Sequence, residues 1–375
     1  MKYFDYTSTT PLHPELLKTY NELLGKYYIN SESLYPEGEE VNRLMEKSRS
    51  ITASLLGVHP KEIIFTSGGS ESNNTAIKGV ALARKDIGKH IITTSIEHSS
   101  VYNSCRWLHD YLGYEITYLK VNQDGVIDVN ELEKAIREDT ILVSIMYVNN
   151  ETGAIQPIDE VKKIVRKHHN TYLHVDCVQA LGKMEIDLKD IDLASFSAHK
   201  INGLKGAGLL MKKQHVMMAE LISAGQQENH LRGGTSNACT NILWGKTLRL
   251  ALDSLQQHQQ VVTQLHDYLY DLLENTEGIV LNSARNGSPY IINFSALNVT
   301  SQVMMNALVM KGFEVSAVST CDSNEAISRV VAQMYSDEKR LKGTIRVSIS
   351  YQHTKQDVDE LYQAIREIIS EYGIN

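Results

Sequence analysis

Residues 172–200 read YLHVDCVQALGKMEIDLKDIDLASFSAHK, and this stretch decides the fold. It holds two short runs, 172–176 and 193–197, that have the length and the bounds of buried β-strands. Polar side chains follow both runs, with Asp176 closing the first and Lys200 shortly after the second. In an open α/β sheet, ligands gather at the carboxyl ends of the strands, so these residues are the first candidates for a site.

The same pattern extends in both directions from this stretch. Short β-branched runs alternate with amphipathic stretches of helical length between residues 61 and 210. This alternation predicts an α/β fold with a mostly parallel, seven-stranded sheet that is covered by helices on both faces. The predicted strands are residues 62–66, 90–94, 115–119, 141–148, 172–176, 193–197 and 207–211, and the predicted helices between them are residues 70–84, 99–111, 129–137 and 158–168.

The C-terminal third has a mixed pattern that predicts a second, smaller α+β domain. A chain of 375 residues exceeds the usual size of one compact core, which also favours two domains. We predict a large domain over residues 13–255 and a small domain made of residues 1–12 and 256–375. The elements predicted after residue 241 are a helical stretch to 273, strands at 290–295 and 344–350, and helices at 302–311 and 357–372.

Composition and charge place the chain among ordinary globular proteins. Hydrophobic residues make up 42% and charged residues 22% of it, which argues against disorder and collagen. The formal net charge is -8 and the basic residues form no stripe, so we expect no direct nucleic-acid partner. No apolar run approaches the roughly 20 residues of a membrane helix, and the first residues do not form a signal peptide. We therefore expect a cytoplasmic protein without a membrane partner.

Four cysteines, Cys105, Cys177, Cys239 and Cys321, lie far apart and form no CxxC pair. This spacing argues against a disulfide framework and against a thiolate zinc site, and we predict no bound metal. Isolated cysteines in a reducing compartment are mostly small buried hydrophobes, so a reactive role for any of them needs support from its position.

Lys200 ends the run SFSAHK at residues 195–200, and a glycine-rich turn follows at 202–208. Most lysines are solvated surface charges, but one at the mouth of the sheet is desolvated, which lowers its pKa and favours imine formation with an aldehyde cofactor. Asp176 closes the neighbouring strand, and a buried carboxylate needs a cationic partner such as a protonated pyridine nitrogen. Gln179 could then hydrogen-bond the ring hydroxyl. A plain helix N-cap is an equally good interpretation of Asp176.

Residues 65–74, FTSGGSESNN, combine a strand end, a glycine turn and a helix start rich in hydroxyl groups. Exposed amides and the helix dipole suit a phosphate there, although such turns are often only helix caps. Because the pattern is neither a P-loop nor GxGxxG, a monophosphate fits better than a nucleotide.

The stretches EHSS at 97–100 and NNETG at 149–153 follow two other strand ends. His98 in the first could stack on a flat ring and move protons, or could be purely structural.

Taken together and in this order, these motifs resemble those of the class V aminotransferases, and specifically the cysteine desulfurases. The resemblance spans nearly the whole chain, from FDYTSTTP at residues 4–11 to TIRVS at residues 344–348. It implies a pyridoxal 5′-phosphate-dependent transferase of fold type I, and a homodimer, because the family supplies one phosphate contact from the other subunit. The other motifs that carry it are TSGGSESNN, EHSS, NNETG, HVDCVQALGK, SFSAHKINGLKG, NSESL at 30–34 and RGGT at 232–235.

The resemblance implies a role for each matching residue. Lys200 holds the cofactor as a Schiff base, and His98 stacks on the cofactor ring and transfers protons. Arg346 clamps the substrate carboxylate with its bidentate guanidinium, and Asn30 lies near the same group. The remaining cofactor contacts are Asp176 at the ring nitrogen, Gln179 at the ring hydroxyl, Asn150 at the ring, and Gly69, Ser70, Ser197, His199 and, from the other subunit, Thr235 at the phosphate.

The resemblance also implies the reaction. L-Cysteine gives up its sulfur, L-alanine is released, and a persulfide remains on a loop cysteine, whose position Cys321 matches. A sulfur-acceptor protein then serves iron–sulfur cluster, thionucleoside or thiamine synthesis. The chain has VSTC at 318–321 where the family commonly has Gly-Ser-Ala-Cys, which bears on the rate of sulfur transfer and on the acceptor. Cys239 follows the subunit-crossing loop and is a candidate for a second sulfur site.

Two alternatives remain open. The same site could serve selenocysteine cleavage, β-elimination or transamination, but elimination and transamination need no loop thiol, so Cys321 favours sulfur transfer. A chain of a different class, a catalytically silent binding partner in sulfur assembly, would need none of Lys200, Asp176, His98 and Arg346, and their presence argues against it.

Overall fold

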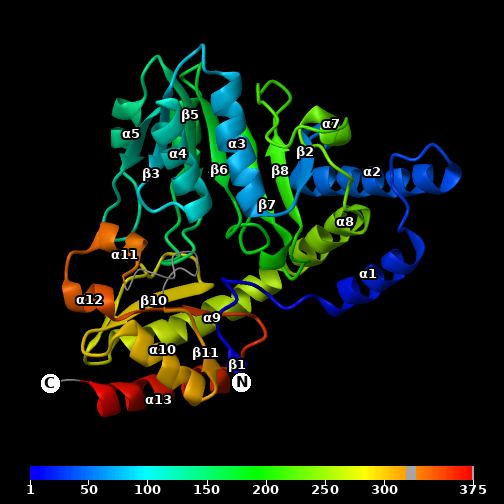
Figure 1. Cartoon of the computed structure of the whole chain (residues 1–375). Coiled ribbons are helices and arrows are strands. Elements are labelled where there is room, and N and C mark those ends of the chain that lie inside the picture. Colours follow the sequence, from blue (N-terminus) through cyan, green and yellow to red (C-terminus); the bar gives the residue numbers. More distant parts are fainter. Residues whose placement is uncertain (318–326, 374–375) are drawn as a thin grey trace.

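The computed structural model describes residues 1–317 and 327–373 and contains a seven-stranded sheet (Figure 1). Its strands are β2 (Ile63–Thr66), β3 (His90–Thr94), β4 (Glu115–Leu119), β5 (Thr140–Met146), β6 (Tyr172–Asp176), β7 (Leu193–Ser197) and β8 (Gly208–Lys212). They lie in the order β2-β8-β7-β6-β5-β3-β4. Neighbours from β4 to β7 pair in parallel, and β8 is antiparallel to both β2 and β7. The predicted mostly parallel α/β sheet is confirmed.

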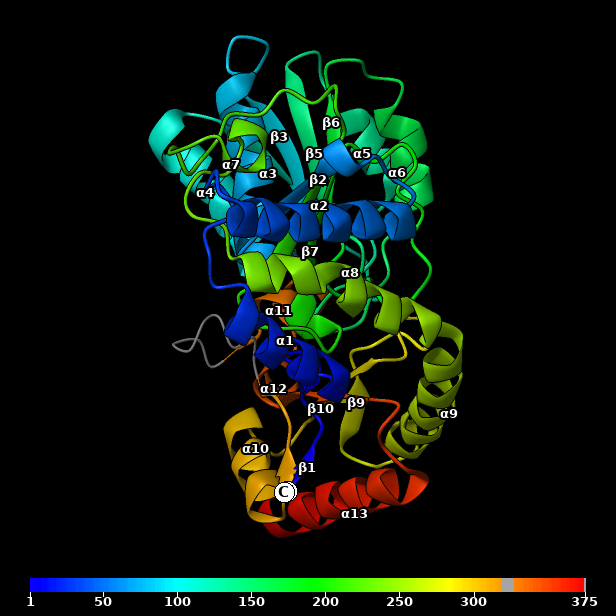
Figure 2. The same ribbon diagram turned by 90° about the vertical axis from the view of Figure 1, so that its right-hand side faces the viewer.

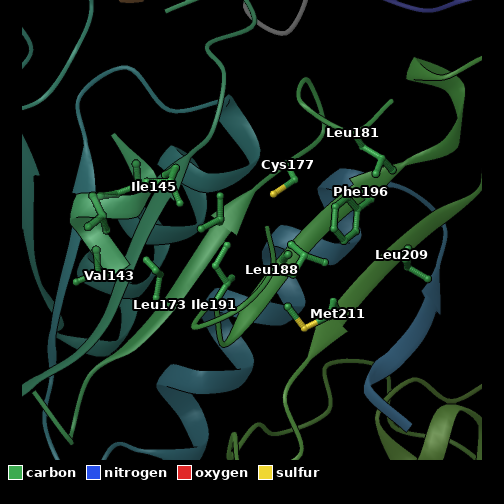
Figure 3. Packing of buried hydrophobic residues seen from close by; sticks show 14 of the residues in the cluster. Val143, Ile145, Leu173, Cys177, Leu181, Leu188, Ile191, Phe196, Leu209 and Met211 are labelled. Atoms are coloured by element: carbon green, nitrogen blue, oxygen red, sulfur yellow. The ribbon is translucent and has the colours of Figure 1, made fainter. Parts of the chain in front are cut away.

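Two hydrophobic clusters cover the two faces of this sheet, because successive side chains of a strand point to opposite sides. In β2, Ile64 belongs to one cluster, while Ile63 and Phe65 belong to the other. Helices α3 (Gly69–Ala83) and α4 (Ser99–Leu112) contribute to the cluster around Ile64. Figure 3 shows side chains of the other cluster along β5 to β8. Helices that contribute to this cluster are α2 (Pro36–Leu56), α5 (Val129–Ala135), α6 (Ile158–Val165) and α8 (Ala238–Asp253) (Figure 2).

A second group of elements lies below the large sheet in Figure 1 and has its own hydrophobic core. The N-terminal strand β1 (Lys2–Tyr3) pairs in parallel with β11 (Phe313–Glu314), and Phe4 lies in this core. The start of the chain is therefore joined to its C-terminal third. The other elements are an antiparallel sheet of β12 (Thr344–Ser348), β10 (Ile291–Ala296) and β9 (Ile279–Leu281), and helices α9 (Leu255–Glu274), α10 (Ser301–Met310), α11 (Arg329–Met334), α12 (Glu338–Lys342) and α13 (Lys355–Tyr372). The domain boundaries after residues 12 and 255 stay a prediction.

Some helices differ from the sequence expectation. The helices α1 (Pro14–Lys26) and α2 were not predicted, although each has proline at its start, which is a typical helix-starting signal. The helical stretch predicted from 241 to 273 is two helices, because Ser254 caps both α8 and α9 with a backbone outside the helical region. Across the described residues, every helix is too short or too polar to cross a lipid bilayer.

A buried ion pair ties α2 to the edge of the large sheet. Arg49 of α2 donates through Nη1 to Oε2 of Glu228 at 2.7 Å and through Nη2 to Oε1 at 2.9 Å. Glu228 lies in the short helix α7 (Gln227–His230) and also accepts the backbone N–H of Phe65 at 2.9 Å. Because both side chains are buried, each charge depends on the other in place of water.

We predict that Glu228→Ala destabilises the fold by about 3 kcal/mol, because it leaves the buried Arg49 guanidinium with only the exposed Glu46 as a counter-charge. Glu40→Ala is the matched control, since Glu40 forms an equally bidentate pair with Arg43 on the same helix but at the surface. Exposed pairs contribute little, so we expect the control to unfold close to the wild type. Urea unfolding followed by circular dichroism measures both, and equal midpoints for the two variants would contradict the role given to Glu228.

Candidate functional site

The carboxyl ends of the parallel strands border a cavity of about 260 Å³. The register of the sheet explains why side chains meet there, since Asp176 of β6 pairs with Met146 at the end of β5 and with Ser195 in β7. Most of the predicted site residues line this cavity, namely Gly69, Ser70, His98, Asn150, Asp176, Gln179, Ser197, His199, Lys200 and Arg346. The fold thus brings together residues that the sequence places on six separate segments.

Lys200 ends a single turn of 3-10 helix, η2 (Ala198–Lys200), that directly follows β7. Its Nζ donates to the carbonyl oxygens of Thr7 at 2.6 Å and Ser8 at 2.7 Å. Asn202 follows with a φ of +60°, a left-handed conformation that asparagine tolerates better than most residues. The N-terminal segment therefore holds the lysine amine at the wall of the cavity.

Asp176 is a buried carboxylate with neutral partners. It is 5% exposed, its Oδ2 accepts from Nδ2 of Asn73 at 2.7 Å, and its Oδ1 accepts the backbone N–H of Val178 at 3.0 Å. Among the described residues, no lysine, arginine or histidine forms an ion pair with Asp176, and the buried Arg49 and Arg346 pair with Glu228 and Asp5 instead. Such a carboxylate fits a ligand that brings a positive charge, such as a protonated pyridine nitrogen. The bond to Val178 closes a turn, and the structure has no helix between β6 and β7, so the interpretation of Asp176 as a helix N-cap is wrong.

His98 caps the start of α4 and belongs to the same hydrogen-bond network. Its Nδ1 accepts the backbone N–H of Ser100 at 3.2 Å and lies 2.7 Å from the Oγ of that residue. An accepting Nδ1 leaves the proton of the neutral ring on Nε2. Burial lowers the pKa of His98, while Asp176 acts in the opposite direction. Asn73 donates to both Ser100 and Asp176, so the imidazole and the carboxylate are linked through two side chains.

Another part of the cavity has the features of a phosphate site. Gly69 and Ser70 begin α3, whose 15 residues give its N-terminus unpaired amides and the positive end of the dipole. A Cβ at Gly69 would lie 2.7 Å from Cγ2 of Val178, so glycine keeps this approach open. Ser197 ends β7, and His199 follows it. Burial lowers the pKa of His199 to about 4, so this ring is neutral near pH 7 and serves as a hydrogen-bonding group.

Arg346 of β12 reaches the cavity from the other part of the molecule. Its Nη2 donates to Oδ1 of Asp5 at 2.8 Å and to Oγ of Ser8 at 2.7 Å, and its Nη1 donates to the carbonyl oxygen of Asn150 at 2.9 Å. Its buried Nε has no acceptor within the described part of the chain. A carboxylate ligand would therefore meet a guanidinium that is already paired with Asp5, a partner that the sequence analysis did not identify.

Several residues at the site were not predicted from the sequence. Thr7, Ser8 and Asn73 line the cavity, and all three stand inside motifs that carry the family resemblance, so membership of a motif was the available signal. Glu97 is buried directly before His98 in the chain. It accepts a backbone N–H at 3.0 Å, and burial raises its pKa to about 8, so this carboxyl is largely protonated near pH 7.

Two predicted residues lie away from the cavity of their own chain. Asn30 stands in the loop between α1 and α2, and Thr235 stands in the loop between α7 and α8. Neither lines the cavity. The contact with a second subunit that the resemblance implies for Thr235 stays a prediction.

Cys321 lies outside the described residues. The chain on either side of the gap is fixed beside the cavity. Before it, Ser316 and Arg346 exchange two backbone hydrogen bonds, of 2.8 and 3.2 Å. After it, Ser328 donates to the carboxylate of Glu151, and Arg329 donates to the carbonyl oxygen of the residue before His98.

The chain is similar to known proteins over nearly its whole length. A model of the family described as aminotransferase class-V matches residues 2–361. The chain is 39% identical to the cysteine desulfurase IscS of Dictyoglomus turgidum over 372 residues, which cover 98% of this chain and 94% of that protein. A NifS-like protein of known structure matches with a TM-score of 0.92 at 35% identity, covering 98% of this chain and 99% of the other. SspA in complex with cysteine matches with a TM-score of 0.81 at 31% identity, covering 94% and 100% of the two chains. The chain therefore belongs to the class V aminotransferase family.

Proposed function

We propose that this protein is a pyridoxal 5′-phosphate-dependent cysteine desulfurase that converts L-cysteine to L-alanine and keeps the sulfur as a persulfide on Cys321. The family to which the chain belongs uses this cofactor. The observation that carries the proposal is Asp176, a buried carboxylate with neutral partners in a cavity that also holds the Lys200 amine. A carboxylate with only a structural role would be expected beside a counter-ion, as Glu228 lies beside Arg49.

The residues of the cavity fit the cofactor along its length. Asp176 would hold the protonated ring nitrogen, His98 would stack on the ring, and Lys200 would hold the cofactor covalently through its amine. Gln179 would hydrogen-bond the ring hydroxyl, and Asn150 would contact the ring. When bound, the cofactor withdraws electrons from the α-carbon of an amino acid. The residues that match the phosphate contacts are Gly69, Ser70, Ser197 and His199.

Three side chains would act on the substrate itself. Arg346 would bind the carboxylate of cysteine, and its buried Nε is a donor that no described acceptor uses. The Lys200 amine would take the α-proton, because it lies at the wall of the same cavity. His98 has a buried ring whose lowered pKa favours the neutral form, so it can accept a proton and return it.

Cys321 would supply the nucleophile. Its thiolate attacks the sulfur of the bound cysteine, so that an S–S bond forms while the Cβ–S bond of the substrate breaks. The electron pair of the broken bond stays with Cβ, which takes up a proton. The products are alanine and a persulfide, so no outside oxidant is needed. The fixed positions of Ser316 and Ser328 beside the cavity support this role, because they flank the segment that contains Cys321.

We propose that the active form is a homodimer in which Asn30 and Thr235 complete the cavity of the partner. Tyr28 and Leu34 support this, since they flank Asn30 and are 81% and 94% exposed, as expected of side chains that a second subunit covers. The three described cysteines are buried free thiols, which supports a reducing cytoplasmic setting. A sulfur-acceptor protein would take the sulfur from Cys321 for iron–sulfur cluster, thionucleoside or thiamine synthesis.

We predict that Cys321→Ala keeps its bound cofactor but forms alanine from L-cysteine at a rate that is lower by about 100-fold or more. The reason is that no thiolate accepts the sulfur. Alanine and sulfide are measured with a reductant present, and cofactor binding is followed by visible absorbance. Cys239→Ala is the control and should keep wild-type activity, since burial raises the pKa of that thiol. Equal sulfide production by Cys321→Ala and the wild type would instead indicate elimination or another thiol.

We predict that Asp176→Asn lowers the rate of alanine formation by about 100-fold or more and changes the visible spectrum of the cofactor. The reason is that a neutral amide cannot hold the ring nitrogen in its protonated form. Asp192→Asn is the control, because Asp192 accepts the backbone N–H of Leu173 at 2.8 Å but does not line the cavity. A wild-type rate and spectrum in Asp176→Asn would leave this residue with a structural role only.

A further inference from the structure

Lys183 is a buried lysine that the proposed mechanism does not use. It is 8% exposed, and its Nζ donates to Oε1 of Gln179 at 2.5 Å. The preceding residue, Gly182, has a left-handed φ of +69°, and a Cβ there would lie 2.9 Å from Cγ2 of Ile201. The turn that places Lys183 behind Gln179 therefore requires glycine.

Among the described residues, the amine of Lys183 has no counter-ion. Within the described part of the chain, no carboxylate lies within ion-pair distance of its Nζ, whereas the equally buried Lys162 is paired with two aspartates at 3.1 and 3.3 Å. Burial, with the charges of Lys200 and Arg346, lowers the pKa of Lys183 to about 7. A buried amine of this kind costs stability, so stabilisation of the fold does not account for it.

Lys183 fixes which way the amide of Gln179 points. The Oε1 of Gln179 accepts from Lys183, and its Nε2 donates to the carbonyl oxygen of Thr7 at 3.1 Å. Turning the amide over would set its oxygen against the oxygen of Thr7 and, when Lys183 is protonated, its N–H groups against the Nζ of Lys183. One N–H of Nε2 is used by Thr7, and the other has no acceptor within residues 1–317 and 327–373.

Gln179 and Lys183 line different cavities. Gln179 lines the cavity that fits the cofactor, and Lys183 does not. Lys183 lines a neighbouring cavity of about 230 Å³, and the two cavities share Thr7 and Lys200 as a common wall. By direct contact, Lys183 would therefore reach the cofactor through Gln179.

We propose that Lys183 is a positioning residue, which holds the amide of Gln179 so that an N–H group, and not the carbonyl oxygen, faces the ring hydroxyl of the cofactor. The inference rests on the proposed function, since it assumes that the cavity binds pyridoxal phosphate. An N–H donor stabilises the ionised hydroxyl, whereas a carbonyl oxygen in the same place repels it. Lys183 would thus help to set the ionisation state of the bound cofactor without touching it.

The test compares Lys183→Met with the wild-type holoenzyme in pyridoxal phosphate affinity and in the pH titration of the visible cofactor band. Methionine is an unbranched side chain that ends where the Cε of lysine lies, so it removes the Nζ donor and keeps most of the length. We expect about tenfold weaker cofactor binding and a titration moved to higher pH, because the ionised hydroxyl has lost an oriented donor. The charged and titratable groups that line the cavity stay the same in both proteins, namely His98, Asp176, His199, Lys200 and Arg346.

Two further variants separate the positioning role of Lys183 from the general effect of removing a buried lysine. Lys162→Met removes a lysine of the same burial that does not line the cofactor cavity, and we expect it to leave the cofactor band unchanged. Gln179→Leu removes the amide on which Lys183 acts. We expect Lys183→Met to cause no additional change in the Gln179→Leu background.

The outcomes distinguish the inference from the proposed function. A wild type that binds no pyridoxal phosphate overturns the proposed function, and this inference with it. A wild type that binds the cofactor while Lys183→Met leaves affinity and titration unchanged overturns the inference alone. The same holds if Lys183→Met shifts the titration equally in the Gln179→Leu background, because Lys183 would then act directly through its charge. Should Lys183→Met fail to fold, Lys183→Leu takes its place in each comparison.

Discussion

The parallel hydrogen bonding of β3, β5, β6 and β7 is the constraint on which the site depends. Parallel strands all end at the same edge of a sheet, so the residues that follow them meet there whatever their distance in the chain. Helices cover both faces of the sheet, and these four strands are almost fully buried. The polar residues that follow the strand ends therefore meet there, and His98, Asn150, Asp176 and Lys200 gather at one cavity.

The N-terminal segment joins the two parts of the molecule at this cavity. Phe4 lies in the hydrophobic core of the C-terminal part, and Asp5 pairs with Arg346 of β12. A few residues later, the carbonyl oxygens of Thr7 and Ser8 hold the amine of Lys200, which belongs to the large sheet. The substrate-binding arginine and the cofactor-binding lysine proposed above are thus placed relative to each other by one short stretch of chain.

Several buried ionisable groups near the cavity have no partner of opposite charge among the residues that the structure describes. Asp176 and Lys183 have neutral partners, and burial raises the pKa of Glu97 to about 8. Far from the cavity, the equally buried Arg49 is fully matched by a carboxylate. Uncompensated burial reduces stability, and its occurrence beside a cavity is typical of a functional site, where a ligand supplies or uses the missing charge.

The sequence by itself determined the strands, most of the helices of the sheet, and the residues that stand at strand ends, because strand length, helical periodicity and short motifs are local properties. It therefore identified Lys200, Asp176, Gln179 and His98 as a group. It did not reveal that Thr7 and Ser8 hold Lys200, that Asp5 pairs with Arg346, or that Ser254 splits a long helical stretch. Only the tertiary structure decided these contacts, since they join residues hundreds of positions apart, or depend on packing against another element, and leave no periodic signal. The orientation of Gln179 by Lys183 is a case between the two, because the residues are four apart in the chain but face different cavities.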